Sequence, residues 1–322
     1  MPKIIKSLAA MLYICCFTNI AAAQSFQITP GDFYTANYFE HNIDRYDRNG
    51  KFLDSFTPAF NSAEVKGLAF GQDGMLYAVA ADDPFITGGA GYSVIALDGS
   101  GKIRQTYHIA PSYIGGNLSL GKITFDKAGH FYVGSLAGLT RFDVGKPNSG
   151  TLIYQTSELY DVKALPSGNL LVADGYSINE ITRTGKLVRK IPSPDISLSN
   201  IRGIEYNPAT NTIFVTMLDN GFLLMGLNGA TGKLLGYTSF NYGDDMFLAD
   251  DGRLIVGSRT QHPGIFTQNL QQIGSFTGNN RMFVTQAPTA VPEPSALTVL
   301  LTVVAGGAFL QRRRRRCASN GV

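Results

Sequence analysis

The chain has 322 residues, with 27 Lys and Arg against 24 Asp and Glu and a hydrophobic content of 44%, which is typical of a globular protein. Its three cysteines, Cys15, Cys16 and Cys317, all lie in terminal segments. The region between them therefore excludes disulfides, thiolate metal sites and cysteine nucleophiles. About 270 residues remain there, enough for one sizeable core without cross-links.

The N-terminus has the pattern of a secretory signal peptide. Lys3 and Lys6 precede an apolar segment from Leu8 to Ile20, and Ala21-Ala22-Ala23 follows as an A-x-A cleavage site. Bulky residues before Cys15 and Cys16 argue against a lipobox. We therefore expect residues 1–23 to be a signal peptide handled by the Sec machinery, with cleavage before Gln24.

From residue 24 to residue 287 the chain repeats a unit of four short strands. The clearest copy has strands at Val65 to Phe70, Met75 to Ala81, Tyr92 to Leu97 and Lys102 to Ile109. First strands recur near Val65, Gly121, Tyr160, Ile201 and Asp244. A Gly-Lys pair precedes the fourth strand at Gly50-Lys51, Gly101-Lys102, Gly185-Lys186 and Gly232-Lys233. Glycine there supplies the positive φ of a tight hairpin. Helical periodicity is absent, which indicates an all-β array.

The repeats predict a closed ring. The first unit, Gly31 to Phe60, has three strands and lacks the innermost one, whereas a leftover strand from Arg281 to Gln286 follows the sixth unit. If the leftover strand completes the first unit, the ring closes without free inner edges. We therefore predict a six-bladed β-propeller, with a β-sandwich or an open β-solenoid as the alternatives.

The repeats resemble the NHL and SMP-30-like propellers. The resemblance is clearest in Gly168-Asn169-Leu170-Leu171-Val172-Ala173-Asp174, followed by Ile178-Asn179-Glu180-Ile181. It implies a six-bladed propeller over most of Gly31 to Gln286. Tryptophan is absent, which excludes the WD dipeptide of WD40 blades and the tryptophans of quinoprotein propellers.

Strand direction sorts the charged residues onto two faces of such a ring. First strands begin, and second strands end, on the same face, which we call the crossover face because the chain passes from blade to blade there. The opposite face, which carries the tight turns, is the turn face. We expect any binding site on the crossover face or in the central channel. The candidate ligand or cation residues on the crossover face are Glu64, Asp82, Asp174, Asp219, Asp244 and Asp245.

Two interpretations of these carboxylates stay open. In the first, they form a binding site, either as oxygen ligands of Ca²⁺ or another divalent cation or as hydrogen-bond partners of sugar hydroxyls. In the second, Asp174 and Asp219 cap turns, and Asp244 and Asp245 are solvated loop charges. No cofactor is required by the pattern. An SMP-30-like lactonase needs a Glu, Asn and Asp set around one ion, and no local motif here matches that family. The four histidines, His41, His108, His130 and His262, lack metal-ligand spacing.

The C-terminus has three parts in order. The motif Val291-Pro292-Glu293-Pro294 closes a linker over residues 288–294, and an uncharged helix over residues 295–311 follows. A basic tail over residues 312–322 carries Arg312, Arg313, Arg314, Arg315 and Arg316. We expect the helix to span the membrane and the arginines to stay in the cytoplasm.

This tail resembles the PEP-CTERM sorting signal of Gram-negative bacteria. The resemblance implies an exosortase that cuts near the motif, after an inner-membrane intermediate, and releases the folded part to the cell surface or extracellular matrix. A plain tail anchor is the alternative. Without residues 1–23 and 295–322, 20 Lys and Arg face 24 Asp and Glu, a net charge of −4, and nothing favours nucleic-acid binding.

The expected function is therefore binding at the cell surface, of exopolysaccharide or of a surface protein. The alternative is a metal-dependent propeller hydrolase or lactonase.

Overall fold

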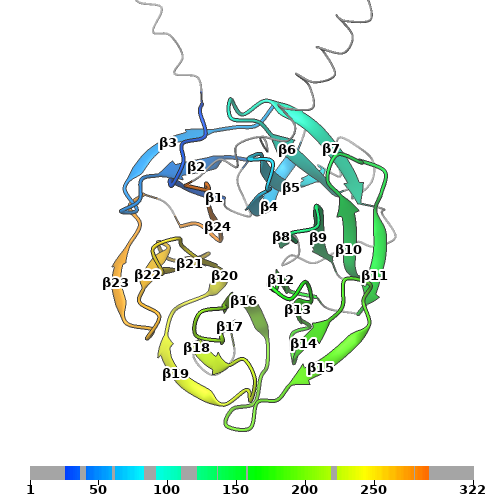
Figure 1. Ribbon diagram of the computed structural model, residues 1–322. Coiled ribbons are helices and arrows are strands. Elements are labelled where there is room, and N and C mark those ends of the chain that lie inside the picture. Colours follow the sequence, from blue (N-terminus) through cyan, green and yellow to red (C-terminus); the bar gives the residue numbers. More distant parts are fainter. Residues whose placement is uncertain are drawn as a thin grey trace, which may run out of the picture.

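The computed structural model describes residues 26–36, 41–59, 62–82, 92–109, 122–135, 137–156, 159–218, 223–278 and 280–289. In this part of the chain the regular secondary structure consists of strands, arranged as six four-stranded antiparallel sheets around a common axis (Figure 1). The predicted six-bladed β-propeller is confirmed. The signal peptide and the C-terminal tail lie outside the described residues.

Five blades are built from consecutive strands, numbered from the innermost outward. Blade 1 contains β4 (Ser62–Phe70), β5 (Leu76–Asp82), β6 (Tyr92–Leu97) and β7 (Ile103–Ile109). Blade 2 contains β8 (Ile123–Phe125), β9 (His130–Ser135), β10 (Gly138–Asp143) and β11 (Thr151–Gln155). Blade 3 contains β12 (Asp161–Ala164), β13 (Leu170–Ala173), β14 (Ile178–Ile181) and β15 (Leu187–Ile191).

Blades 4 and 5 follow the same order. Blade 4 contains β16 (Ile201–Asn207), β17 (Thr212–Met217), β18 (Leu223–Asn228) and β19 (Leu234–Ser239). Blade 5 contains β20 (Gly243–Leu248), β21 (Leu254–Ser258), β22 (Gly264–Phe266) and β23 (Gln272–Ser275).

The sixth blade closes the ring from both ends of the chain. It consists of β24 (Phe283–Gln286) as the innermost strand, followed by β1 (Phe33–Ala36), β2 (Ile43–Tyr46) and β3 (Phe52–Phe56). Phe33 pairs with Gln286 and Ala36 with Phe283 in an antiparallel register. The predicted exchange between the incomplete first unit and the leftover strand is therefore confirmed, and we call this sheet the closing blade.

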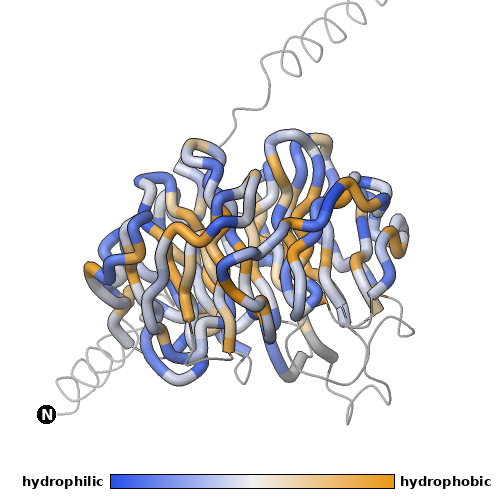
Figure 2. Tube along the Cα trace, turned by 90° about the horizontal axis from the view of Figure 1, so that it is seen from below, coloured by the Kyte–Doolittle hydropathy of each residue, from blue (hydrophilic) through white to orange (hydrophobic). Residues whose placement is uncertain are grey.

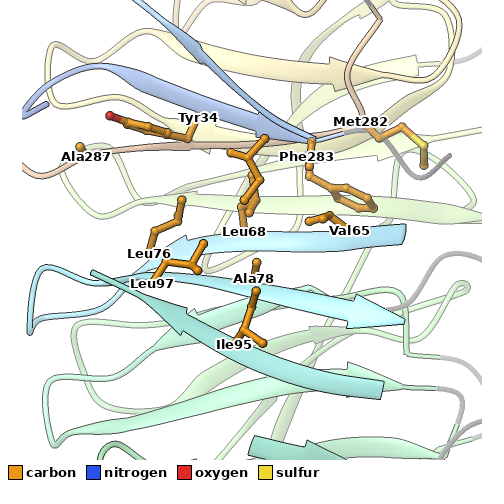
Figure 3. Close-up of a cluster of buried hydrophobic side chains, with 12 residues drawn as sticks. Tyr34, Val65, Leu68, Leu76, Ala78, Ile95, Leu97, Met282, Phe283 and Ala287 are labelled. Atoms are coloured by element: carbon orange, nitrogen blue, oxygen red, sulfur yellow. The ribbon is translucent and has the colours of Figure 1, made fainter. Parts of the chain in front are cut away.

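The hydrophobic core is divided among the blade interfaces. Six clusters of buried side chains each draw on two neighbouring blades. Figure 3 shows the cluster between the closing blade and blade 1, where Tyr34, Leu68 and Phe283 pack together and are at most 6% exposed. The side view in Figure 2 shows strands running between the two faces of a disc, with apolar residues within the disc. Burial of these interfaces is the main stabilising contribution to the ring.

The tight turns have the backbone that the Gly-Lys repeats predict. Gly50, Gly101, Gly185 and Gly232 have φ values of 79°, 75°, 84° and 68°. A residue with a Cβ adopts this left-handed region only at a cost. In the first of these turns Asp47 Oδ1 accepts hydrogen bonds from the N–H groups of Asn49 and Lys51, at 2.8 and 3.0 Å. These contacts fix the turn face of the disc.

Candidate functional site

A cavity lies on the propeller axis, among the six innermost strands. Its volume is about 320 Å³, and β4, β8, β12, β16, β20 and β24 all contribute to its lining. Figure 1 shows these strands surrounding the centre of the disc. Lys122, Asp161 and Asp245 line its crossover end. The lining continues past the strand ends to Asp250, which is exposed, and Pro288, which is partly exposed. The cavity therefore opens on the turn face.

Lys122 is the central cation of this cavity. Its side chain is buried, and its Nζ lies 2.5 Å from Asp245 Oδ1 and donates to the carbonyl oxygen of Asp244 at 2.6 Å. The ammonium also lies 5.3 Å from the centroid of the Phe283 ring. A buried ammonium requires this kind of charge pairing and hydrogen bonding. Lys122 therefore connects blade 2 with blade 5 and the closing blade across the axis.

The buried carboxylates of the cavity accept hydrogen bonds from the next blade. Asp161 Oδ2 accepts from the backbone N–H of Ile204 at 2.7 Å, and Asp245 Oδ2 accepts from that of Val284 at 3.0 Å. An innermost strand is a sheet edge whose inward N–H groups have no strand partner. Because buried N–H groups must find acceptors, these carboxylates satisfy the edge and join neighbouring blades.

The same contact recurs nearer the turn face. Glu205 Oε2 accepts a hydrogen bond from the N–H of Leu248 at 3.3 Å and pairs with Lys163 Nζ at 2.6 Å. Thr124 Oγ1 accepts from the N–H of Ala164 at 3.2 Å. Four successive inner strands, β12, β16, β20 and β24, are thus each capped by a side chain of the preceding blade.

Burial gives Asp161 an unusual titration. Removal from water raises the pKa of its carboxyl to about 7, and the Asp245 carboxylate adds to this rise. The Lys122 ammonium and the N–H groups of Ile204 and Val162 act in the opposite direction. The shift follows from placing two carboxylates beside one ammonium in a buried site.

The structure distributes the predicted candidate residues among different contacts. Asp245 lines the cavity, whereas Asp244 pairs with Arg259, with Nε to Oδ2 at 3.0 Å. Both belong to β20 and are buried, so the interpretation of these two residues as solvated loop charges is wrong. The reason is that the strand begins at Gly243 and already includes them.

Among the remaining candidates whose side chains the structure describes, Glu64 and Asp174 do not line the cavity. Glu64 lies 3.1 Å from Lys66 Nζ in β4. Asp174 accepts hydrogen bonds from Ser177 and Asn179, which is the turn-capping interpretation that the sequence left open. Asp82 ends β5, and Asp219 lies outside the described residues. Within the described ranges no group of three or more His, Cys, Asp or Glu side chains is arranged to hold a metal ion.

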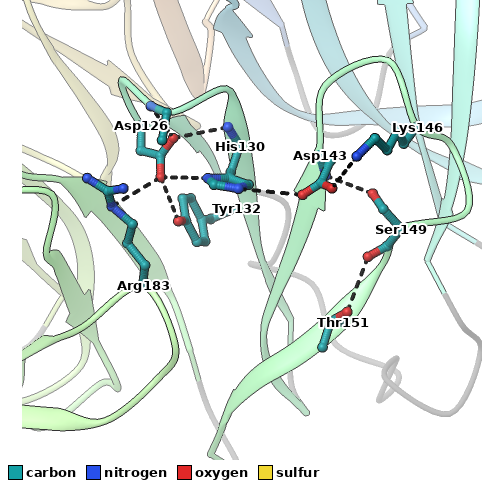
Figure 4. Close-up of polar contacts among 9 residues, drawn as sticks. Asp126, His130, Tyr132, Asp143, Lys146, Ser149, Thr151 and Arg183 are labelled. Atoms are coloured by element: carbon teal, nitrogen blue, oxygen red, sulfur yellow. Dashed lines mark hydrogen bonds and ion pairs between the residues drawn. The ribbon is translucent and has the colours of Figure 1, made fainter.

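A second polar cluster lies at the turn face of blade 2 (Figure 4). His130 Nδ1 is 3.0 Å from Asp126 Oδ2, which also accepts a hydrogen bond from the Tyr132 hydroxyl and lies 3.5 Å from Arg183 Nε. Burial raises the pKa of the Asp126 carboxyl, but hydrogen bonds from His130, Tyr132 and Ala128 outweigh it and hold that pKa below its ordinary value. Asp126 thus has the contacts of a structural carboxylate that joins blades 2 and 3.

Sequence reasoning missed Lys122, Lys163 and Glu205 as cavity residues. Each is a charged side chain at or in an otherwise apolar first strand: Lys122-Ile123-Thr124-Phe125, Val162-Lys163-Ala164 and Ile204-Glu205-Tyr206. Because first strands are innermost in a propeller, a charged residue within one is a candidate for the axial cavity, although Lys66 in β4 and Asp244 in β20 pair elsewhere. Comparison of the first strands alone would have found all three.

No protein-family model matches the chain, and no curated protein matches it. A chain of the crystal structure of a nidogen/laminin complex is similar in structure, with a TM-score of 0.61 and 12% identity over 80% of this chain and 98% of that chain. The likeness is one of fold. A protein of unknown function from Bacteroides caccae is also similar, with a TM-score of 0.56 and 12% identity over the same shares.

These similarities support the six-bladed propeller fold. In all, 1175 solved chains match the structure, so the fold is widely used and does not indicate an activity by itself. The function has to be argued from the cavity and from the terminal segments.

Proposed function

We propose that this chain is an exported β-propeller that binds a ligand at the cell surface or in the extracellular matrix of a Gram-negative bacterium. The signal-peptide pattern of residues 1–23 and the PEP-CTERM-like tail support this proposal. In it, the Sec machinery exports the chain, the helix over residues 295–311 holds it in the inner membrane, and an exosortase cuts near Pro292-Glu293-Pro294. No helix among the described residues is long and apolar enough to cross a membrane.

The axial cavity is the observation that carries the binding role. Asp161, Asp245 and Glu205 already accept backbone hydrogen bonds and lie beside lysines. Their oxygens are therefore largely occupied in joining blades. The cavity volume of about 320 Å³ falls within the usual range for small-ligand sites, about 300–1,000 Å³.

The mouth of the cavity suits a saccharide unit. Phe70, Phe125 and Phe247 are partly exposed in its lining, together with the polar side chain of Lys163. Aromatic rings offer an apolar surface to the C–H face of a sugar ring, and polar neighbours hydrogen-bond its hydroxyls. We infer that exopolysaccharide is the ligand, with a surface protein as the other partner class.

Binding can be measured with a chain from Gln24 to Ala290, because the described ring closes within these residues. The probe is exopolysaccharide purified from the host, in co-sedimentation and calorimetry. Phe125→Ala and Phe247→Ala should each weaken binding at least about tenfold, as expected when a well-packed aromatic contact is removed. Tyr237→Ala is the matched control, since Tyr237 is 64% exposed on β19. Equal binding by all variants would contradict a site at the cavity mouth.

Metal-dependent hydrolysis is the alternative that the sequence raised. The same purified chain distinguishes it, by measurement of bound divalent metal, of the thermal melt with and without EDTA, and of lactone turnover. Stoichiometric metal together with turnover would support the hydrolase. A chain that melts identically with EDTA and binds polysaccharide would support the binding role.

A further inference from the structure

The described chain ends on the turn face, close to the cavity mouth. β24 runs toward this face, and the N–H of Ala287 then donates to the carbonyl oxygen of Asp32 at 2.9 Å. Pro288 lines the cavity, and the Thr289 hydroxyl donates to Asp250 Oδ2 at 2.9 Å. The propeller therefore holds its C-terminal segment on the turn face as far as residue 289.

The distance from this point to the predicted membrane helix is short. Ser295 follows Thr289 by six residues, which span about 20 Å when fully extended at about 3.4 Å per residue. With residue 295 at the membrane surface, the centre of the turn face cannot be farther away than this. The cavity mouth and the tight turns around it would then be the part of the disc nearest the lipid.

The turn face is also basic, although the region without its targeting segments has a net charge of −4. Among the described residues, four exposed carboxylates lie on or beside the turn face: Asp73, Asp250, Asp251 and Asp195, whose Oδ2 accepts a hydrogen bond from the N–H of Leu234 at the start of β19. They accompany a larger number of exposed cations. The exposed cations come from the turns of the closing blade and of blades 1 to 4. They are Arg48, Lys51, Lys102, Lys127, Lys146, Lys186 and Lys233.

The turn carboxylate of blade 1, Asp98, is engaged with its own turn. Its Oδ1 accepts hydrogen bonds from the N–H groups of Ser100 and Lys102, at 2.8 and 3.1 Å. The Ser100 hydroxyl also donates to Oδ1 at 2.6 Å, and Oδ2 pairs with Arg104. The Ser100 hydroxyl first, and then the backbone and Arg104 contacts, hold the pKa of Asp98 well below its ordinary value. The Lys102 side chain on this turn is exposed to solvent. Basic residues near a bilayer are attracted to anionic headgroups.

From the position of Thr289 and the charge of the turns, we propose that the turn face rests on an anionic lipid surface while the C-terminal helix holds the chain in the membrane. This inference depends on the proposed function for its anchor. It adds an orientation: the cavity mouth faces the bilayer, and the crossover face points away from it. Ligand binding at the mouth then begins after the tail is cut and the disc is released.

Site-specific fluorophores test the orientation. The chain from Gln24 to Val322 with Cys317→Ser has no other cysteine, so single reporters can be placed by Thr184→Cys on the turn face and His262→Cys on the crossover face. Both positions are exposed. In vesicles of phosphatidylcholine with phosphatidylglycerol, a headgroup spin label should quench the Thr184→Cys fluorophore several-fold more than the His262→Cys fluorophore. Equal quenching in vesicles that carry the protein would overturn the proposal.

Charge reversal tests the contribution of the lysines. Lys186 and Lys190 are both exposed. Lys186 immediately precedes β15 at its turn end, and Lys190 lies within β15, near its crossover end. Lys186→Glu should reduce the quenching of the Thr184→Cys fluorophore, and the matched variant Lys190→Glu should leave it unchanged. If both variants behave alike, turn-face charge does not orient the disc.

A second anchor separates this inference from the proposed function. If the full chain fails to float with vesicles, the native tail does not insert and the sorting proposal fails. The chain from Gln24 to Ala290 with a C-terminal histidine tag, held on nickel-chelating lipid, then tests the same face with the same reporters. If an acidic polysaccharide shields the Thr184→Cys fluorophore from solvent and phosphatidylglycerol vesicles do not quench it, the turn face binds polysaccharide. That result would contradict the lipid contact.

Discussion

Asp161 in blade 3 accepts a hydrogen bond from the backbone N–H of Ile204 in blade 4, with 2.7 Å between oxygen and nitrogen. The contact joins two inner strands that do not share a sheet. Together with the contacts of Thr124, Glu205 and Asp245 it forms a series of side-chain caps around the axis. The polar residues of the channel are thus part of what holds the ring together.

The titration of Asp161 predicts a pH-dependent stability. The folded-state pKa of about 7 lies above the value of about 3.9 for an unfolded aspartate. The folded chain keeps the proton where the unfolded chain has lost it, so this group contributes stability that is lost as pH rises through about 4 to 7. In Asp161→Asn this component should be absent. The loss of unfolding free energy between pH 5 and pH 7.5 should be smaller in the variant by about 2 kcal/mol.

Urea unfolding at several pH values measures this difference, and Asp195→Asn, which changes an exposed carboxylate outside the cavity, is the control. The comparison uses the slope with pH, because Asp161→Asn also alters the hydrogen bond to Ile204 at every pH. Parallel pH profiles for wild type and Asp161→Asn would show that Asp161 titrates in its ordinary range.

Closure of the ring depends on Arg281 and Asp44. The side chains of Arg281 and Asp44 are 1% and 2% exposed, and Arg281 Nε donates to Asp44 Oδ2 at 2.6 Å across 237 residues of sequence. Arg281→Ala leaves the Asp44 carboxylate buried without this partner. We expect a loss of about 3–5 kcal/mol in unfolding free energy.

The control for this prediction is Arg104→Ala, which removes an exposed arginine paired with Asp98. It should cost less than about 1 kcal/mol, as exposed ion pairs do. Denaturant titrations of both variants give the comparison. If Arg281→Ala and Arg104→Ala both lose less than about 1 kcal/mol of unfolding free energy, the buried pair does not stabilise the closing blade.

Two glycines with the same backbone angle predict different costs on substitution. Gly185 and Gly129 have φ values of 84° and 85°. A Cβ on Gly185 would lie 1.6 Å from the carbonyl oxygen of Ile153 in the neighbouring blade, whereas one on Gly129 would meet nothing within 4 Å. Both alanine substitutions should lower the free energy of unfolding by about 1–2 kcal/mol, because a residue with a Cβ is unfavourable in the left-handed region.

Gly185→Ala should lose at least about 1 kcal/mol more than Gly129→Ala, because its turn must also move away from β11. Thermal melts of the two variants measure the difference. Equal destabilisation would indicate that the turn of blade 3 does not pack closely on blade 2.

Most of the fold follows from the sequence, because strand length, turn glycines and repeat spacing are local properties. Closure of the ring was also predictable, because the first repeat unit lacks its innermost strand and one strand is left over after the sixth unit. The contacts within the channel depend on convergence in space. Lys122 and Asp245 are far apart in the sequence, and only the closed ring brings them to 2.5 Å. The sequence therefore left open whether Asp244 and Asp245 are ligand residues or solvated loop charges, and the structure places both within β20.

The sorting motif predicts the fate of a variant in the host. Replacing Pro292, Glu293 and Pro294 with alanine removes the extended segment that the exosortase is proposed to recognise, because proline keeps it out of a helix. We expect the full-length variant to remain in the membrane fraction while wild type leaves it. Fractionation with immunoblotting measures this, and Thr289→Ala, which lies outside the motif, is the matched control. Loss of both wild type and the motif variant from the membrane would mean that the motif is not needed.

The intact mass of the protein isolated from its native host tests the central claim most directly. The proposal predicts a chain that begins at Gln24, ends near Pro292-Glu293-Pro294 and lacks Arg312 to Arg316. A mass that includes the sequence through Val322 would contradict it and identify the chain as a membrane-anchored propeller.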